Sequence, residues 1–245
     1  MLTIMDSGGS HVLSDTMEAL IKEKVGDSVF VMEAPVTSIG LEDPDDGVSP
    51  IVVKAGGIDR KYSHVISTLP LPVLRTIDLT NSHLDVLQIN ALRQLEYGPS
   101  CKIGILFTEP WWTTGKDKND EPFNIVGGQS FSDLPIRTVV YPSYGSGTSN
   151  VLIASYTWTT DADRLGALMG TGKKEYDDQL EALVLNNLAT IHNVTYEYLK
   201  TRTVELFPFN WSSDPTTMGE WRVLLLREEY SPCNPTRCIC VLRTR

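Results

Sequence analysis

The stretch from Tyr97 to Trp112 constrains the fold of this chain more than any other. It reads Tyr-Gly-Pro-Ser-Cys-Lys-Ile-Gly-Ile-Leu-Phe-Thr-Glu-Pro-Trp-Trp, with apolar residues at every second position from 101 to 107. This period of two predicts a strand with one face in a core. Lys102 interrupts the pattern, because an ammonium flanked by apolar residues must reach solvent, find a partner or take part in chemistry. Composition alone favours a lysine that reaches solvent at a sheet edge, whereas motifs farther along the chain favour a functional one.

The flanking segments predict an α+β fold. Apolar spacing indicates one helix that ends at Gly26-Asp27 and further helices over residues 84–95 and 173–190. Strands are predicted, besides 101–107, at residues 29–39, 51–55, 62–67, 138–141, 151–158 and 201–209, with a hairpin turn at Gly56-Gly57. The prolines of residues 68–72 mark a candidate domain boundary. We therefore expect three parts: a helix with a β-meander (1–72), a mixed or antiparallel sheet flanked by helices (73–219), and an atypical tail (220–245).

Charge and composition exclude several classes of protein. The net charge of −10 and the pI near 4.9 argue against a nucleic-acid partner. No apolar run approaches the ~20 residues of a membrane helix, and the first residues lack the pattern of a secretion signal. Four cysteines in 245 residues do not make a disulfide scaffold. The cellular compartment and the oligomeric state stay open.

No complete catalytic motif is present in the sequence. The four histidines do not have metal-ligand spacing, and the chain contains no Gly-x-Ser-x-Gly, Walker or Gly-x-Gly-x-x-Gly motif. The pairs Gly8-Gly9 and Gly127-Gly128 are most simply turns. Asp161 and Asp163 are either paired catalytic carboxylates or solvated loop acids, and the second interpretation is favoured.

Aromatic residues gather in three places. Tyr156 and Trp158 are two apart on one predicted strand and so face the same side. Trp111 and Trp112 end the strand of Lys102, and three more aromatics follow the same two-residue spacing at positions 207, 209 and 211. Core packing explains each group separately, and a flat apolar ligand pocket explains them together. Both interpretations stay open at this point.

Several blocks of sequence, in the right order, resemble the L-amino-acid oxidases among the flavin-dependent amine oxidases. They cover roughly residues 4–219 and include Met32-Glu-Ala-Pro-Val, Tyr62-Ser-His-Val-Ile-Ser-Thr-Leu-Pro, Leu95-Glu-Tyr-Gly-Pro-Ser-Cys-Lys, Gly127-Gly-Gln-Ser-Phe-Ser-Asp-Leu-Pro-Ile-Arg, Val151-Leu-Ile-Ala-Ser-Tyr-Thr-Trp-Thr-Thr-Asp-Ala-Asp and Phe209-Asn-Trp-Ser-Ser-Asp-Pro. By this resemblance, residues 1–72 are part of an FAD-binding domain and residues 73–219 a substrate-binding domain. The tail shows no such likeness.

The resemblance implies FAD-dependent oxidative deamination, in which an amine or amino acid becomes an imine and oxygen becomes hydrogen peroxide. It implies that Lys102 holds a water against the flavin, that Val36 touches the adenine end of FAD through its backbone, and that Trp211 packs near the flavin. Tyr156 would contact the substrate carboxylate, and Trp158 would line the side-chain pocket. Lys102 is the expected catalytic residue of this set.

The chain also departs from the pattern of the family. It lacks the glycine-rich dinucleotide motif and the arginine that clamps the substrate carboxylate in the family. Residues 220–245 hold five arginines, no lysine and three of the four cysteines. We therefore expect an internal fragment whose tail comes from a wrong reading frame or an unspliced intron, with a zinc-binding tail as the alternative. A non-catalytic remnant or interaction domain is the alternative to an oxidase.

Overall fold

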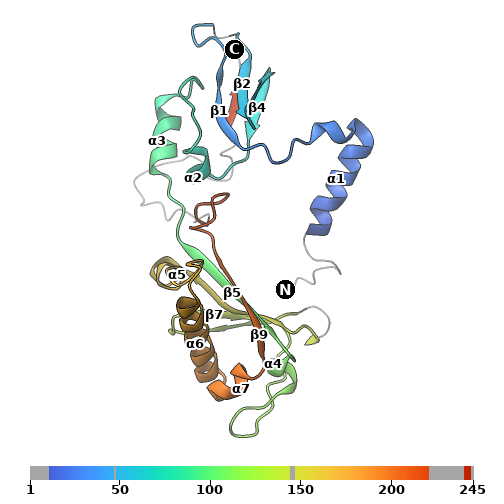
Figure 1. Ribbon diagram of the computed structural model, residues 1–245, viewed down its shortest axis with the longest axis vertical. Coiled ribbons are helices and arrows are strands. Elements are labelled where there is room, and N and C mark those ends of the chain that lie inside the picture. The colour runs from blue at the N-terminus through green and yellow to red at the C-terminus, as the bar shows by residue number, and fades with distance from the viewer. Residues whose placement is uncertain (1–10, 47, 144–146, 221–239, 244–245) are drawn as a thin grey trace. The chain divides into compact units, whose positions relative to one another are not determined.

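The computed structural model of the chain describes residues 11–46, 48–143, 147–220 and 240–243 (Figure 1). These residues form two compact units. Of the described residues, the larger unit contains 11–14 and 98–214, and the smaller unit contains 15–97, 215–220 and 240–243. Helix α1 (His11–Val25) begins in the residues assigned to the larger unit, and none of its residues is buried. No helix in these described ranges is long and apolar enough to cross a membrane.

The larger unit is an antiparallel sheet with helices, as the fold class predicted. The strand order is β6-β7-β8-β5-β9. The strands are β5 (Ser100–Phe107), β6 (Gln129–Phe131), β7 (Thr138–Val140), β8 (Val151–Trp158) and β9 (Thr203–Asn210). The helices are α4 (Trp111–Thr114), α5 (Thr159–Gly166), α6 (Lys174–Ile191) and α7 (Tyr196–Lys200). Strand β5, the predicted strand of Lys102, is central and pairs with both β8 and β9.

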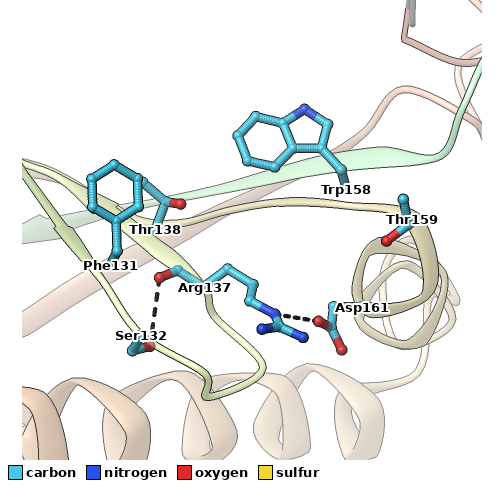
Figure 2. Close-up of a pocket in the computed structure, with 7 residues that line it drawn as sticks. All are labelled: Phe131, Ser132, Arg137, Thr138, Trp158, Thr159 and Asp161. Carbon is cyan, nitrogen blue, oxygen red and sulfur yellow. Dashed lines mark hydrogen bonds and ion pairs between the residues drawn. The ribbon is translucent and has the colours of Figure 1, made fainter. Parts of the chain in front are cut away.

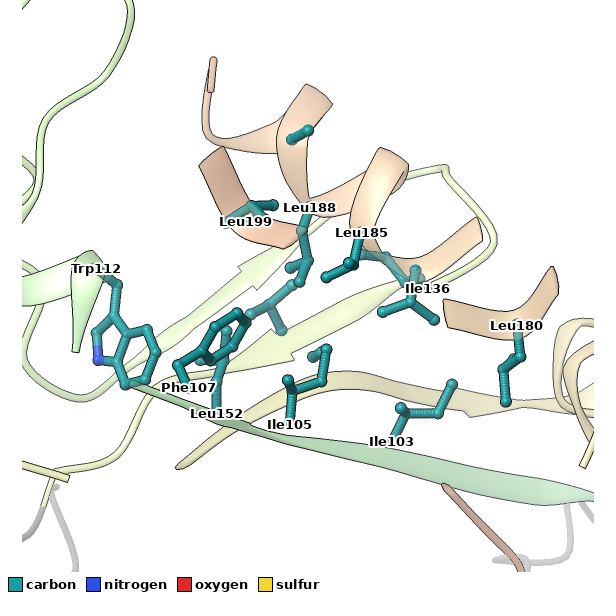
Figure 3. Packing of buried hydrophobic residues seen from close by; sticks show 14 of the residues in the cluster. Ile103, Ile105, Phe107, Trp112, Ile136, Leu152, Leu180, Leu185, Leu188 and Leu199 are labelled. Atoms are coloured by element: carbon teal, nitrogen blue, oxygen red, sulfur yellow. The ribbon is translucent and has the colours of Figure 1, made fainter. Parts of the chain in front are cut away.

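The core lies between one face of this sheet and helix α6 (Figure 3). Ile103 and Ile105 of β5 are fully buried, and Leu185 and Leu188 of α6 pack in the same cluster. The period of two in β5 and the helical period of α6 thus meet in one core, which confirms both predictions. Burying a leucine or isoleucine side chain in this way stabilises the fold by about 1.5–3 kcal/mol.

Trp111 and Trp112 belong to this core and not to a ligand pocket. Both side chains are fully buried, and their ring centroids lie 5.6 Å apart at 82°. Phe107 contacts each of them edge-on at 5.8 Å. Edge-to-face contacts at such distances are the favourable arrangement for aromatic pairs. For this aromatic group, the core interpretation holds.

The smaller unit contains two small sheets and several helices. Strands β1 (Val36–Leu41), β2 (Ile51–Ala55) and β3 (Ile58–Tyr62) form an antiparallel meander. Strand β4 (His64–Ser67) pairs with β10 (Cys240–Arg243). The remaining elements are the 3-10 helix η1 (Asp27–Val29), α2 (Leu71–Leu74) and α3 (Val86–Gln94). Helix α3 begins directly after Asp85, which caps it in a reciprocal capping box with Gln88.

Two predicted strands of this unit were wrong in extent. The strand predicted at 29–39 begins only at Val36, because Pro35 has no N–H for a ladder and Glu33 has a left-handed backbone with φ of 54°. The strand predicted at 62–67 is two strands in different sheets. Gly56 and Gly57 both have positive φ, so the hairpin turn takes only two residues and β3 starts at Ile58.

The predicted zinc-binding alternative for the tail rests on Cys233, Cys238 and Cys240. The first two lie outside the described residues, and for Cys240 only the backbone of β10 is described. Among the residues that the structure describes, no cluster of three or more metal-ligating side chains occurs.

Candidate functional site

Lys102 lies in a cross-strand row on the sheet face opposite the core. The register places it opposite Tyr156 of β8 and opposite Phe209 of β9. Residues directly opposite each other in a sheet share a face, and their side chains are in contact distance. The row therefore joins two residues that are 54 positions apart in the sequence, Lys102 and Tyr156, with a third from the last strand.

The ammonium of Lys102 is held by aromatic rings. Its Nζ lies 4.3 Å from the ring centroid of Tyr156 and 4.9 Å from that of Trp211. In the described part of the chain, no carboxylate or other side chain forms an ion pair or hydrogen bond with Lys102. Cation–π contacts satisfy the charge without using its N–H donors in hydrogen bonds. Lys102 can therefore donate to a bound molecule. The interpretation as an edge-strand lysine was wrong, because β5 pairs with a strand on each side.

Trp211 reaches Lys102 because the chain stays beside β5 for one more residue after β9 ends at Asn210. The backbone N–H of Trp211 donates to the carbonyl of Ser100 at 3.1 Å, which fixes the chain beside β5. The indole of Trp211 packs against Phe209 with ring centroids 4.7 Å apart at 77°. The end of β9 thus contributes two aromatic rings next to Lys102.

The rest of the row is aromatic and open. The Tyr156 and Trp158 rings lie 4.3 Å apart at 47°, and Trp158 is 42% exposed. Phe209 is 43% and Phe207 52% exposed on the same sheet face. An exposed apolar patch of this kind marks a place where a ligand or another protein surface binds. For these aromatics, the predicted ligand surface is the interpretation that the geometry favours.

A hollow of about 280 Å³ lies at the edge of the sheet beside Trp158 (Figure 2). Its walls combine two aromatic rings, three hydroxyl groups and one ion pair. The lining residues are Phe131, Ser132, Arg137, Thr138, Trp158, Thr159 and Asp161. A concave apolar surface with a few polar groups is the usual form of a small-molecule site.

The favoured interpretation of Asp161 as a solvated loop acid was wrong. Asp161 lies in the first turn of helix α5 and is only 7% exposed. Its Oδ2 accepts from Arg137 Nε at 2.5 Å, and its Oδ1 lies 3.4 Å from a terminal nitrogen of Arg164. A carboxylate in a first helical turn is favoured by the helix dipole, and pairing with Arg137 allows it to be buried.

Sequence reasoning missed helix α5 and with it the role of Arg137 and Asp161. The sequence pattern that could have predicted α5 is the three-residue spacing of Ala162 and Leu165, just after the strand that carries Trp158. Both side chains are buried. That signal is short, because α5 has only 8 residues. The pairing of Arg137 with Asp161, 24 residues apart, has no local signal at all.

The structure brings four of the five predicted site residues together. Lys102, Tyr156, Trp158 and Trp211 form one continuous set of contacts in the larger unit. Val36 lies in the smaller unit, where it starts β1 and pairs with Ala55. It is therefore not part of the row around Lys102.

The residues of this row fit a flavin ring. A flavin is flat and largely apolar, and it carries acceptor nitrogen and oxygen atoms along its edge. The exposed ring of Phe209 offers flat apolar contact, and Lys102 offers N–H donors that no acid in the described part of the chain engages. The donor set thus matches the chemistry that the resemblance implies.

Comparison with known proteins identifies the family. Residues 2–237 match the sequence model described as flavin containing amine oxidoreductase. The chain is 66% identical over 215 residues to L-amino-acid oxidase 4 of Hebeloma cylindrosporum. The matched stretch covers 86% of this chain and 34% of that protein. It is 31% identical over 178 residues to the flavin-dependent L-tryptophan oxidase RebO of Lentzea aerocolonigenes, covering 71% of this chain and 34% of that protein. The chain thus spans about a third of the length of these relatives.

The fold of the chain is also found among solved structures. A solved structure of a putrescine oxidase variant matches this chain with a TM-score of 0.62 and 20% sequence identity. The match covers 86% of this chain and 40% of the putrescine oxidase chain. At this identity the likeness shows a shared fold. The family match confirms the resemblance, the oxidoreductase class and a flavin as the cofactor class. The chain belongs to the flavin-containing amine oxidoreductases, a family that oxidises amines.

Proposed function

We propose that this protein uses FAD to oxidise L-amino acids, with oxygen as the final electron acceptor. The overall reaction converts an L-amino acid, water and oxygen into a 2-oxo acid, ammonia and hydrogen peroxide. The observation that carries the proposal is Lys102, whose ammonium lies against two aromatic rings on an open sheet face. The 66% identity to a protein named L-amino-acid oxidase 4 supports the choice of substrate class.

Three residues of the chain would contact the cofactor. Trp211 would pack against the ring system, and Lys102 would donate a hydrogen bond to a water beside it. The backbone of Val36, at the start of β1, would contact the adenine end. The bound flavin supplies the two-electron acceptor that no amino acid side chain provides. Residues 73–219 are the substrate-binding domain in this proposal, and residues 1–72 are part of the FAD-binding domain.

The substrate binds next to Lys102 along the same row. Tyr156 contacts the carboxylate of the amino acid, and Trp158 lines the pocket for its side chain. The two rings are in contact, with centroids 4.3 Å apart, so the carboxylate and side-chain contacts lie side by side. The hollow of about 280 Å³ beyond Trp158 gives room for side chains that extend past the indole.

The first test is peroxide release by the FAD-loaded chain with matched panels of L- and D-amino acids. We expect turnover of L-amino acids only. In Lys102→Met we expect reduction of the flavin under anaerobic conditions to stay within threefold of the unchanged chain, while reoxidation by oxygen slows at least tenfold. Lys116→Met is the matched control, since Lys116 is exposed and pairs with Asp120 at 2.9 Å on a loop.

The alternative function, a non-catalytic remnant or interaction domain, makes the opposite prediction. A folded, FAD-loaded chain that shows no reduction by any L-amino acid would contradict the proposal. So would a Lys102→Met variant that reacts with oxygen as fast as Lys116→Met does.

A further inference from the structure

Trp158 stands directly before a strained residue. Thr159 has φ of 59°, in the left-handed region. For a β-branched residue this conformation is a true outlier, and it persists only where the surroundings impose it. Strand β8 ends with Trp158 and helix α5 begins at Thr159, so the backbone of Thr159 sets the direction in which the chain leaves the sheet after Trp158.

Two interactions restrain this turn. The backbone N–H of Thr159 donates to the carbonyl of Pro99 at 3.0 Å. Two residues later, the carboxylate of Asp161 accepts from Arg137 Nε at 2.5 Å, as Figure 2 shows. The side chain of Asp161 is 10% exposed and that of Arg137 47% exposed, so the carboxylate end of the ion pair is the one shielded from water. The ion pair therefore ties the first turn of α5 to the connection between β6 and β7.

The other end of the ion pair is rigid as well. Arg137 has φ of 53°, and its backbone N–H donates to the carbonyl of Leu134 at 2.9 Å. Its own carbonyl accepts from the backbone N–H of Ser132 at 2.8 Å. Arg137 is thus fixed in a tight turn and presents its guanidinium from a defined point. A rigid anchor of this kind can hold a strained partner, whereas a mobile side chain cannot.

We propose that the Arg137–Asp161 pair is a positioning element of the substrate site: it holds Thr159 in its left-handed conformation and thereby fixes Trp158 against Tyr156. The pair acts through the backbone and touches no reacting atom. The role of Trp158 in the side-chain pocket rests on the proposed function, whereas its fixed position does not. A fixed indole gives the pocket one wall of constant shape, which is what discrimination between side chains requires.

The test is 19F NMR of the chain labelled with 5-fluorotryptophan, which gives one resonance for each of its five tryptophans. Trp158→Phe assigns the resonance of Trp158. We expect a single sharp signal in the unchanged chain. In Arg137→Lys and in Asp161→Asn, a second Trp158 signal should appear, while the signals of the buried Trp111 and Trp112 stay in place. Arg137→Lys keeps the charge beside Asp161, so it carries the test if Asp161→Asn does not fold.

Two further variants separate positioning from general loosening. Arg164→Gln is the matched control, because Arg164 is 74% exposed and 3.4 Å from the same carboxylate, and its Trp158 signal should match the unchanged chain. Glycine adopts positive φ without strain, so adding Thr159→Gly to Arg137→Lys should remove the second signal.

An unchanged Trp158 resonance in both Arg137→Lys and Asp161→Asn would overturn the proposal, because contact with Tyr156 would then suffice to hold the indole. A second signal that persists undiminished with Thr159→Gly would overturn the proposed link through backbone strain. The experiment needs neither flavin nor turnover, so its result is independent of whether the chain oxidises amino acids.

Discussion

Replacing Gly166 by alanine tests how closely helix α5 approaches the strand that leads to Trp211. Gly166 is buried at the end of α5, and a Cβ built on it would lie 2.4 Å from Asn210 Nδ2 and 3.2 Å from its Cγ. Real Cβ atoms do not make such contacts, so the amide of Asn210 must move. That amide donates to Ser213 Oγ at 3.0 Å and accepts from the backbone N–H of Ser212 at 3.0 Å.

The cost of Gly166→Ala follows from these contacts. Moving the amide loses two hydrogen bonds of about 1 kcal/mol each. Alanine regains about 1 kcal/mol of helix propensity relative to glycine. The net loss in the free energy of unfolding is therefore about 1 kcal/mol, rising to about 3 kcal/mol if the amide cannot rotate away and the backbone must shift. Urea unfolding followed by tryptophan fluorescence measures the loss.

Two controls make this prediction specific. Gly104→Ala also adds a methyl group to the larger unit, but its Cβ would meet Phe207 at an ordinary 3.8 Å, so we expect no loss. Asn210→Ala removes the colliding amide, so Gly166→Ala should cost nothing further in that background. The reasoning is refuted if Gly166→Ala is as stable as Gly104→Ala, or if Asn210→Ala fails to relieve its cost.

Three further predictions concern residues away from the site. Asp85→Ala should lower the stability of helix α3 by about 1 kcal/mol through loss of the capping box, seen as faster hydrogen exchange confined to α3. Burial lowers the pKa of His192 below its ordinary 6.5, and its Nδ1–H donates to Leu188 while Tyr141 donates to Nε2. The unfolded chain therefore takes up the proton more readily, so Tm should fall as pH drops below about 6.5 and less so in His192→Gln, as thermal scans from pH 7.5 to 5.5 will show. Burial raises the pKa of the Cys101 thiol, so peptide mass spectrometry should find Cys101 alkylated by iodoacetamide at least tenfold faster in urea than in the folded chain.

The sequence-based prediction succeeded where burial follows a short period. Strand β5 and helix α6 each carry a repeating apolar pattern that meets one core, so their positions followed from spacing alone. The same alternation put Lys102 on the face away from the core, next to whatever strands pair with β5. The register of these strands brings Tyr156 and Trp211 next to Lys102. The spacing did not predict these two neighbours, which were named from the family resemblance.

The prediction failed where distant residues decide the structure. The Arg137–Asp161 pair buries a carboxylate that local composition marks as a solvated acid. Likewise, period two alone could not separate Trp112, which packs into the core, from Trp158, which lies on the open face. Whether a side chain at the end of a strand is buried or exposed depends on which face of the sheet the helices cover. Tertiary contacts decide the positions of these helices.

An FAD titration of the purified chain tests the central claim most directly, because that claim is that the aromatic face around Lys102 receives a flavin. We expect saturable one-to-one quenching of flavin fluorescence, and at FAD concentrations of 100 Kd a stabilisation of about 2.7 kcal/mol. Trp211→Leu should weaken binding at least tenfold, whereas Tyr176→Leu, in helix α6 on the other face of the sheet, should leave Kd unchanged. A folded chain without saturable FAD binding, or one whose Kd is the same in both variants, would contradict the account.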